Sequence, residues 1–395
     1  MNCGSEWIYY GAGMVYKKNR HFKEAEEKFR YLLAIYPSYG NAYVQLGFIR
    51  KNEGKKFEAK ALFEKGLSYN PENENAHHQI GLLQMQSKNY NDAANNFSRV
   101  LELNPNRTDA MVHLGITMGG KGDFCAAENL ITQSYSKDQE QKNGYARLGW
   151  IKAERQDWPS AVEIMSRDLK AGRISSAWQI KLAIGQAFTG DYDNAVKLIE
   201  DLYNNDKDAV DGFARLGWAS YLSSGDEQKL HFLVAKDIHL KRLSVDGNKI
   251  MAMAMFLRGE LIQAGKLIDS LYAKYPYAKD GFATMGWLHI EKVDLEQGIA
   301  LMGKDYRMQR LSTVWKINYA YQLLKTGESQ TAGSILNEIM KLEPHQQEFR
   351  IGYQLKPLKI ISKRDIEQMA IKSGLAGQKH RRTDKLTSSQ CNCGL

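Results

Sequence analysis

The chain has 395 residues, 43% of them hydrophobic and 25% charged, which are the proportions of an ordinary folded protein. No apolar run approaches the roughly 18–20 residues that span a bilayer, and four cysteines in so long a chain do not predict a disulfide framework. The net charge is +9, but residues from Lys356 onward carry a surplus of six cations, so the charge is weak evidence for a basic binding groove.

The first residues give no targeting signal. Residues 1–7 lack a basic region followed by an apolar core, so a secretion signal is not predicted and the expected location is cytoplasmic. Residues 1–5 are expected to form a frayed lead.

From Glu6 onward a pattern recurs every 34 residues. The positions shared by the first three copies are a bulky residue at 4, Gly at 8, Ala at 20, Phe at 24 and Pro at 32. Positions 4, 7, 8 and 11 form one apolar face of a helix, and the proline ends a second helix. The first three copies are carried by Tyr9, Gly13, Tyr16, Ala25, Phe29 and Pro37, then Tyr43, Leu46, Gly47, Ala59, Phe63 and Pro71, then His77, Ile80, Gly81, Ala93, Phe97 and Pro105.

Three nearly identical stretches extend the pattern along the chain. They are residues 145–150, 213–218 and 282–287, which lie 68 and 69 residues apart, or two periods. Turn-plus-alanine markers occupy the half-steps, at residues 190–195, 259–264 and 327–332.

This pattern resembles the tetratricopeptide repeat family. The resemblance implies an all-α fold without a sheet: an α-solenoid, a right-handed superhelix of about ten helix-turn-helix repeats. The expected repeats are residues 6–39, 40–73, 74–107, 108–141, 142–175, 176–209, 210–244, 245–278, 279–312 and 313–346.

Two regions after the array are expected to differ from it. Residues 347–377 should cap the last repeat, with a helix that begins at Ser362 or Asp365. Residues 378–395 have almost no apolar side chains and should form a disordered basic tail, whose cations are Lys379, Arg381, Arg382 and Lys385.

Repeats seven to nine depart from the pattern and are expected to open first. Lys229 stands at a small-residue position, an extra residue lies near Gly225, and Gly298 replaces alanine. Each change is expected to weaken packing between helices.

The chain contains no phosphate-binding loop or dinucleotide motif, so it is not expected to be an enzyme or to carry a cofactor. His77 fills a packing position, and Cys391 and Cys393 lack a second cysteine pair, so no metal site is predicted.

In the family, positions 2, 5/6, 9 and 12/13 of the first helix line a concave groove that holds ligands. Two interpretations of the residues there stay open: a binding surface with exposed rings, or structural tryptophans that support each hairpin. The predicted partner-binding residues are Trp150, Trp218, Trp287 and Tyr321 at position 9, with Arg147, Lys181 and Arg215 at position 6.

The family's known clamp for a terminal carboxylate is not predicted, because none of the corresponding residues is cationic. They are Tyr10, Met14, Gln45, Asn75 and Gln79.

The predicted function is a non-catalytic scaffold or adaptor that holds an extended protein or peptide in the groove. The alternative is a carbohydrate-binding accessory protein of polysaccharide assembly or export, since tryptophan faces stack on sugar rings. A third reading is the regulatory arm of an enzyme on another chain. Specific nucleic-acid binding is not predicted, and the oligomeric state and the partner are left open.

Overall fold

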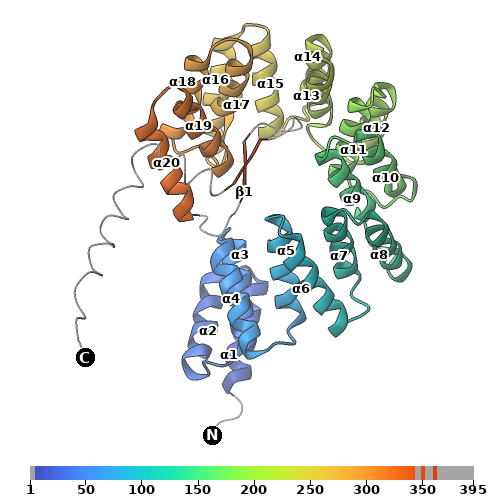
Figure 1. Cartoon of the computed structure of the whole chain (residues 1–395), viewed down its shortest axis with the longest axis vertical. Coiled ribbons are helices and arrows are strands. Elements are labelled where there is room, and N and C mark those ends of the chain that lie inside the picture. Colours follow the sequence, from blue (N-terminus) through green and yellow to red (C-terminus); the bar gives the residue numbers. More distant parts are fainter. Residues whose placement is uncertain (1–4, 343–347, 352–358, 363–395) are drawn as a thin grey trace, which may run out of the picture. The chain divides into compact units, whose positions relative to one another are not determined.

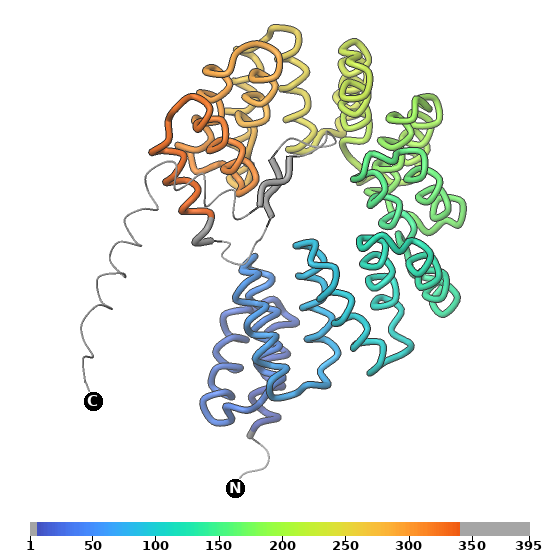
Figure 2. Tube along the Cα trace, viewed as in Figure 1, coloured from blue at the N-terminus to red at the C-terminus, as the bar shows by residue number. Residues whose placement is uncertain are grey.

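Helical hairpins make up nearly all of the described part of this computed structural model, which comprises residues 5–342, 348–351 and 359–362 (Figure 1). The chain divides into two compact units, Met1–Trp178 and Gln179–Leu395. Within each unit, the hairpins follow one another in chain order (Figure 2).

In the first unit, each pair of helices packs as a hairpin, and the second helix of one hairpin contacts the first helix of the next. The odd-numbered helices, here called the first helices, open each hairpin. The helices are α1 (Ser5–Lys18), α2 (Phe22–Ile35), α3 (Gly40–Asn52), α4 (Lys56–Tyr69), α5 (Glu74–Gln86), α6 (Tyr90–Leu103), α7 (Thr108–Lys121), α8 (Phe124–Lys137), α9 (Gly144–Glu154) and α10 (Trp158–Lys170). Helix α11 (Ser176–Phe188) begins in this unit and ends in the next.

The second unit continues the same packing, and its described part also contains two strands after the last helix. Its helices are α12 (Tyr192–Asn205), α13 (Gly212–Ser224), α14 (Glu227–His239), α15 (Val245–Leu257), α16 (Leu261–Lys274), α17 (Gly281–Lys292), α18 (Leu295–Arg307), α19 (Thr313–Lys325) and α20 (Ser329–Leu342). The strands β1 (Glu348–Ile351) and β2 (Lys359–Ser362) pair antiparallel, and β1 lies beside α19.

The α-solenoid prediction is confirmed, but the expectation that no sheet exists is wrong. Residues 348–351 and 359–362, which the pattern assigned to the capping segment, form a strand pair in which Glu348 lies opposite Ser362. The capping helix expected after Ser362 and the basic tail lie outside the described residues.

Close glycine–aromatic contacts explain the strongest positions of the 34-residue pattern. Phe29 is fully buried, and a Cβ at Gly13 would lie only 2.6 Å from its ring. The pairs Gly47–Phe63 and Gly81–Phe97 repeat this arrangement in the next two hairpins. Glycine at position 8 is therefore needed for the two helices of a hairpin to approach each other around the ring.

The three near-identical stretches each begin a first helix that a buried hydrogen-bond network holds, here called the tyrosine–aspartate lock. In one copy, Tyr272 Oη donates to Asp305 Oδ1 (2.6 Å) and accepts from the Gly281 N–H (2.7 Å), while Asp305 Oδ2 accepts from the Ala283 N–H (2.8 Å). The other two copies use Tyr135, Gly144, Ala146 and Asp168, and Tyr203, Gly212, Ala214 and Asp237.

An arginine covers the tyrosine ring of each lock. The Arg310 guanidinium lies 4.9 Å from the ring centroid of Tyr272 and donates to the backbone carbonyls of Pro276 (2.5 Å) and Ala278 (3.0 Å). Arg173 lies over Tyr135 and Arg242 over Tyr203 in the same way. The lock therefore fastens each of these hairpins to the hairpin before it.

The lock makes stability depend on pH, because burial raises the pKa of Asp237 and of Asp305 to about 6, against 3.8 for an ordinary aspartate, although the tyrosine hydrogen bonds lower it. Between about pH 4 and 6, the folded state keeps protons that the unfolded state has released. The stabilising contribution of protonation is thus complete below about pH 4 and is lost as the pH rises through about 6.

Comparing wild type with Asp305→Asn isolates this effect, since the amide cannot ionise. The free energy of unfolding of wild type relative to the variant should fall by about 2–3 kcal/mol as the pH rises from about 4 to 7. Urea unfolding followed by circular dichroism at each pH measures the difference, and a constant difference across this range would contradict the prediction.

Two of the residues expected to weaken repeats seven to nine have other roles. The extra residue shifts the register, so that fully buried Leu230 occupies the packing position and the Lys229 ammonium lies 3.8 Å from the ring centroid of Tyr192. Gly298 lets α17 and α18 approach closely, because a Cβ there would lie 2.6 Å from the carbonyl oxygen of Gly286. The expectation that these repeats open first now depends on the extra residue near Gly225 alone.

Gly298→Ala should destabilise the second unit by about 1–3 kcal/mol, since the added methyl group would be forced against backbone atoms. Gly265→Ala in α16 is the matched control, because a Cβ there meets only a Phe282 ring atom at 3.9 Å. The control should be neutral or stabilising by up to about 1 kcal/mol, the helix-propensity gain of alanine over glycine. Equal unfolding midpoints for the two variants would show that the close approach is not tightly packed.

Candidate functional site on the first helices

Side chains in the first unit connect each first helix to the next. The Gln45 amide of α3 donates from Nε2 to Tyr10 Oη of α1 (3.2 Å), and its Oε1 accepts from Lys17 Nζ of the same helix. The Lys17 ammonium also lies 4.4 Å from the ring centroid of Phe48. This lysine is therefore half-buried between a neutral amide and an aromatic ring.

The same kind of contact continues along α5, α7 and α9. Lys51 Nζ donates to Gln79 Oε1 (2.5 Å), repeating the Lys17–Gln45 contact one hairpin later. His78 and His113 are joined through Nε2 and Nδ1 (3.1 Å), and Arg147 Nη1 lies 3.2 Å from His113 Nε2. We call these residues the bridging ladder: Tyr10, Lys17, Gln45, Lys51, His78, Gln79, His113 and Arg147.

The two histidines of the bridging ladder are neutral near physiological pH. Burial lowers the pKa of His78 to about 4 and that of His113 to about 3, and neighbouring Arg147 adds to the shift of His113. Because Arg147 can only donate to His113 Nε2, we assign the proton of His113 to Nδ1, from which it donates to His78. Arg147 is thus hydrogen-bonded to a neutral ring.

Burial also lowers the pKa of Lys17 and of Lys51 from the usual lysine value. Some other half-buried cations face carboxylates, as Arg50 does with Glu53 (2.8 Å) and Lys316 with Glu338 (2.5 Å). Within the described residues, neither Lys17 nor Lys51 forms an ion pair.

Of the predicted partner-binding residues, Arg147 and Trp150 belong to the first unit. Arg147 is part of the bridging ladder. Trp150 is half-buried and packs edge-on against Trp158 (centroids 6.1 Å apart) and Trp178 (6.4 Å). Its ring therefore contributes to packing between hairpins.

The predicted cations of the second unit are partly exposed. Lys181 is half-buried on α11. Arg215 on α13 lies 3.7 Å from a carboxylate oxygen of Asp211 and 3.6 Å from one of Asp246. Unlike the lysines of the bridging ladder, Arg215 is neutralised by the chain itself.

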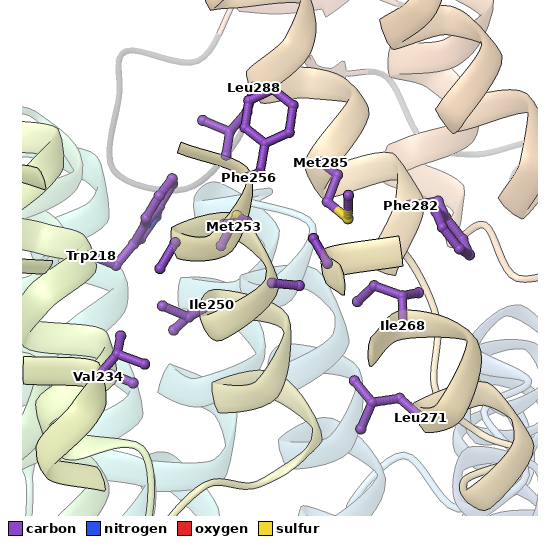
Figure 3. Close-up of a cluster of buried hydrophobic side chains, with 14 of the residues drawn as sticks. Trp218, Val234, Ile250, Met253, Phe256, Ile268, Leu271, Phe282, Met285 and Leu288 are labelled. Carbon is purple, nitrogen blue, oxygen red and sulfur yellow. The ribbon is translucent and has the colours of Figure 1, made fainter. Parts of the chain in front are cut away.

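The expectation that Trp218 exposes a ring face is wrong. Trp218 is only 2% exposed and belongs to a hydrophobic cluster that joins α13 to α15 and α17. Figure 3 shows Trp218 reaching toward the helix that carries Ile250 and Met253. The large apolar side chains of α15 leave no room for a ligand on this ring.

Trp287 and Tyr321 are partly exposed to solvent. Trp287 is half-buried, packs edge-on against Trp315 (6.2 Å) and donates from Nε1 to Glu291 (3.0 Å). Tyr321 is also half-buried, with the Lys325 ammonium 4.8 Å from its ring centroid. The four position-9 aromatics therefore do not form a uniform exposed ladder.

Lys17 and Lys51, which stand at position 12 of their repeats, were not among the binding residues predicted from the sequence. Each contacts a glutamine at position 6 of the next repeat, and the spacing is 28 residues in both cases. This repeated lysine–glutamine spacing was the available signal. The basic-tail residues Lys379, Arg381, Arg382 and Lys385 lie outside the described residues.

The part of the chain that the structure describes contains neither a cluster of metal-binding side chains nor a membrane-spanning helix. No group of three or more His, Cys, Asp or Glu side chains there could hold a metal ion. No helix in this part has the length and apolar character needed to cross a membrane.

The hairpins and their stacking define the class of an α-solenoid built from helical repeats. The family model of the tetratricopeptide repeat matches residues 40–73 and 74–107. These residues form the hairpins α3–α4 and α5–α6, so these two hairpins are similar to tetratricopeptide repeats.

Solved structures of similar fold include other members of this class. A tetratricopeptide repeat protein from Parabacteroides merdae ATCC 43184 is 14% identical, covering 64% of this chain and 99% of its own, with a TM-score of 0.49. Pseudomonas aeruginosa pilF is 16% identical, covering 59% of this chain and 97% of its own, with a TM-score of 0.40. YrrB, described as having an unusual peptide-binding site, is 20% identical, covering 41% of this chain and 84% of its own, with a TM-score of 0.37. No curated protein matches the sequence significantly.

Proposed function

We propose that the chain is a non-catalytic scaffold that binds an extended protein segment along the first helices. The observation that carries this proposal is the bridging ladder, which places half-buried donors and acceptors on five successive first helices of one unit. A row of this kind suits a ligand that runs across several hairpins, because each successive repeat adds its own contacts with the ligand. The peptide-binding site named for YrrB is in keeping with a peptide ligand.

The structural features favour a protein over a carbohydrate. Stacking on sugars needs exposed aromatic faces, yet Trp218 is buried, and Trp150 and Trp287 are half-buried beside other tryptophans. Amide, ammonium and guanidinium groups instead match the backbone and side chains of a peptide.

Site-specific photo-crosslinking in cells tests this function. A photoreactive amino acid replaces Met14 of α1 or Gln86 of α5, and the matched controls place it at exposed Lys23 of α2 or Asn95 of α6. We expect one discrete protein adduct at the first-helix positions and none at the controls. Adducts at the second-helix positions alone would overturn the proposal.

A further inference from the structure

We propose that the first three hairpins bind an acidic segment of the partner, with carboxylates seated on Lys17 and Lys51. This inference rests on the proposed function and names the chemistry of the ligand. It concerns side-chain carboxylates within an extended segment, at positions other than those that clamp a terminal carboxylate in the family.

The first reason is that each of the two lysines contacts a neutral glutamine and has no carboxylate partner in the part of the chain that the structure describes. Each ammonium group has three donors, and each of these lysines uses one of them on a glutamine oxygen. The remaining donors have no carboxylate within the described residues. A half-buried cation without a counter-charge has lost part of its hydration, so an incoming carboxylate restores a charged partner at little further desolvation.

The second reason is that the lysines are held in place before a ligand arrives. Gln45 is itself fixed by its hydrogen bond to Tyr10, and Phe48 lies under the Lys17 ammonium. Ordering these long side chains in advance removes part of the entropy that a flexible surface lysine loses on binding. The geometry therefore resembles a formed site more than a solvated row of charges.

The third reason is the repeat of the site one hairpin later. Neighbouring packed helices lie about 8–10 Å apart, and an extended peptide advances about 3.3 Å per residue. Carboxylates that point to the same side, about two to four residues apart in the ligand, would match the two lysines. The ligand is thus expected to alternate acidic and other residues.

Fluorescence anisotropy with a labelled peptide of alternating serine and glutamate, about twelve residues long, measures the binding. The peptide with glutamine in place of glutamate is the ligand control. We expect the acidic peptide to bind and the glutamine peptide not to bind. The affinity for the acidic peptide should fall as the salt concentration is raised from about 50 to 500 mM.

The double variant Lys17→Gln/Lys51→Gln should bind the acidic peptide with an affinity lower by at least about tenfold. Lys23→Gln with Lys56→Gln removes the same charge from exposed positions on α2 and α4 and should change affinity less than about twofold. Equal weakening in both double variants would show a general charge effect and overturn the site.

Wild-type protein gives an independent readout that does not depend on variant folding. Carbodiimide joins a peptide carboxylate to a lysine amine with loss of water, and mass spectrometry locates the bond. We expect bonds at Lys17 and Lys51, and bonds at Lys23 or Lys56 instead would overturn the proposal.

Two outcomes separate this inference from the proposed function. If a protein adduct forms at Met14 or Gln86 but the acidic peptide does not bind, the scaffold stands and the acidic ligand is wrong. A single-stranded oligothymidylate that outcompetes the peptide at the same lysines would overturn the acidic peptide in favour of a nucleic acid.

Discussion

Trp218→Ala should lower the free energy of unfolding by about 3–5 kcal/mol, the usual cost of removing a large aromatic side chain from a core. Trp218 is 2% exposed and packs with Ile250 and Met253 of the next first helix and with Tyr221 of its own (centroids 5.2 Å apart). The cavity would lie between α13 and α15 and would remove side-chain contacts that hold these two helices together. Urea unfolding followed by circular dichroism measures the loss.

Trp287→Ala is the matched comparison, since Trp287 occupies the same repeat position but is only half-buried. We expect a cost of about 1–2 kcal/mol there, because less apolar area is removed from contact. A Trp218→Ala protein as stable as wild type would mean that the ring can leave the core, and the binding interpretation of this residue would return.

These two tryptophans show that a repeat pattern predicts the hairpins but does not predict how far a position-9 side chain is buried. The pattern identifies hairpins reliably because the apolar face and the Gly13–Phe29 type of contact are local to one repeat. Burial of a position-9 side chain depends instead on the following first helix. Met253 and Ile250 cover Trp218, while the Trp315 ring lies at 72° to the Trp287 ring with centroids 6.2 Å apart. Nearly identical stretches can therefore have different surroundings.

The sequence contains a repeated spacing of residues around the tyrosine–aspartate lock, but the spacing alone does not reveal the hydrogen bonds. An aspartate, an arginine five residues later and a serine two residues beyond occur three times, as Asp168, Arg173 and Ser175, then Asp237, Arg242 and Ser244, then Asp305, Arg310 and Ser312. Charged residues are usually exposed, so nothing in the pattern indicated that these carboxylates are fully buried. Only the fold shows that they accept hydrogen bonds from the preceding hairpin's tyrosine.

The lysines of the bridging ladder illustrate a similar limit. The sequence places Lys17 and Lys51 on the expected ligand-facing stripe, where charged residues are ordinarily solvated. Their contacts with Gln45 and Gln79 cross between hairpins, so they depend on how two repeats pack. Each of these lysines contacts the glutamine of the next repeat, and that contact is a property of the structure.

Asp305→Ala should cost about 3–5 kcal/mol of unfolding free energy, because it leaves the Tyr272 hydroxyl and the Ala283 N–H buried without an acceptor. Asp269→Ala removes an equal charge from an exposed pair with Lys304 (3.0 Å) and should cost less than about 1 kcal/mol. Both variants are compared by urea unfolding at the same pH.

A double-mutant cycle shows whether Tyr272 and Asp305 act as one unit. Tyr272→Phe alone should also destabilise, since it removes both the donor to Asp305 and the acceptor of the Gly281 N–H (2.7 Å). Because the two side chains share a hydrogen bond, the cost of the double variant should be smaller than the sum of the single costs by about 1–3 kcal/mol. Strict additivity would mean that the lock is two independent contacts, and that the hairpins are joined mainly by the apolar side chains around it.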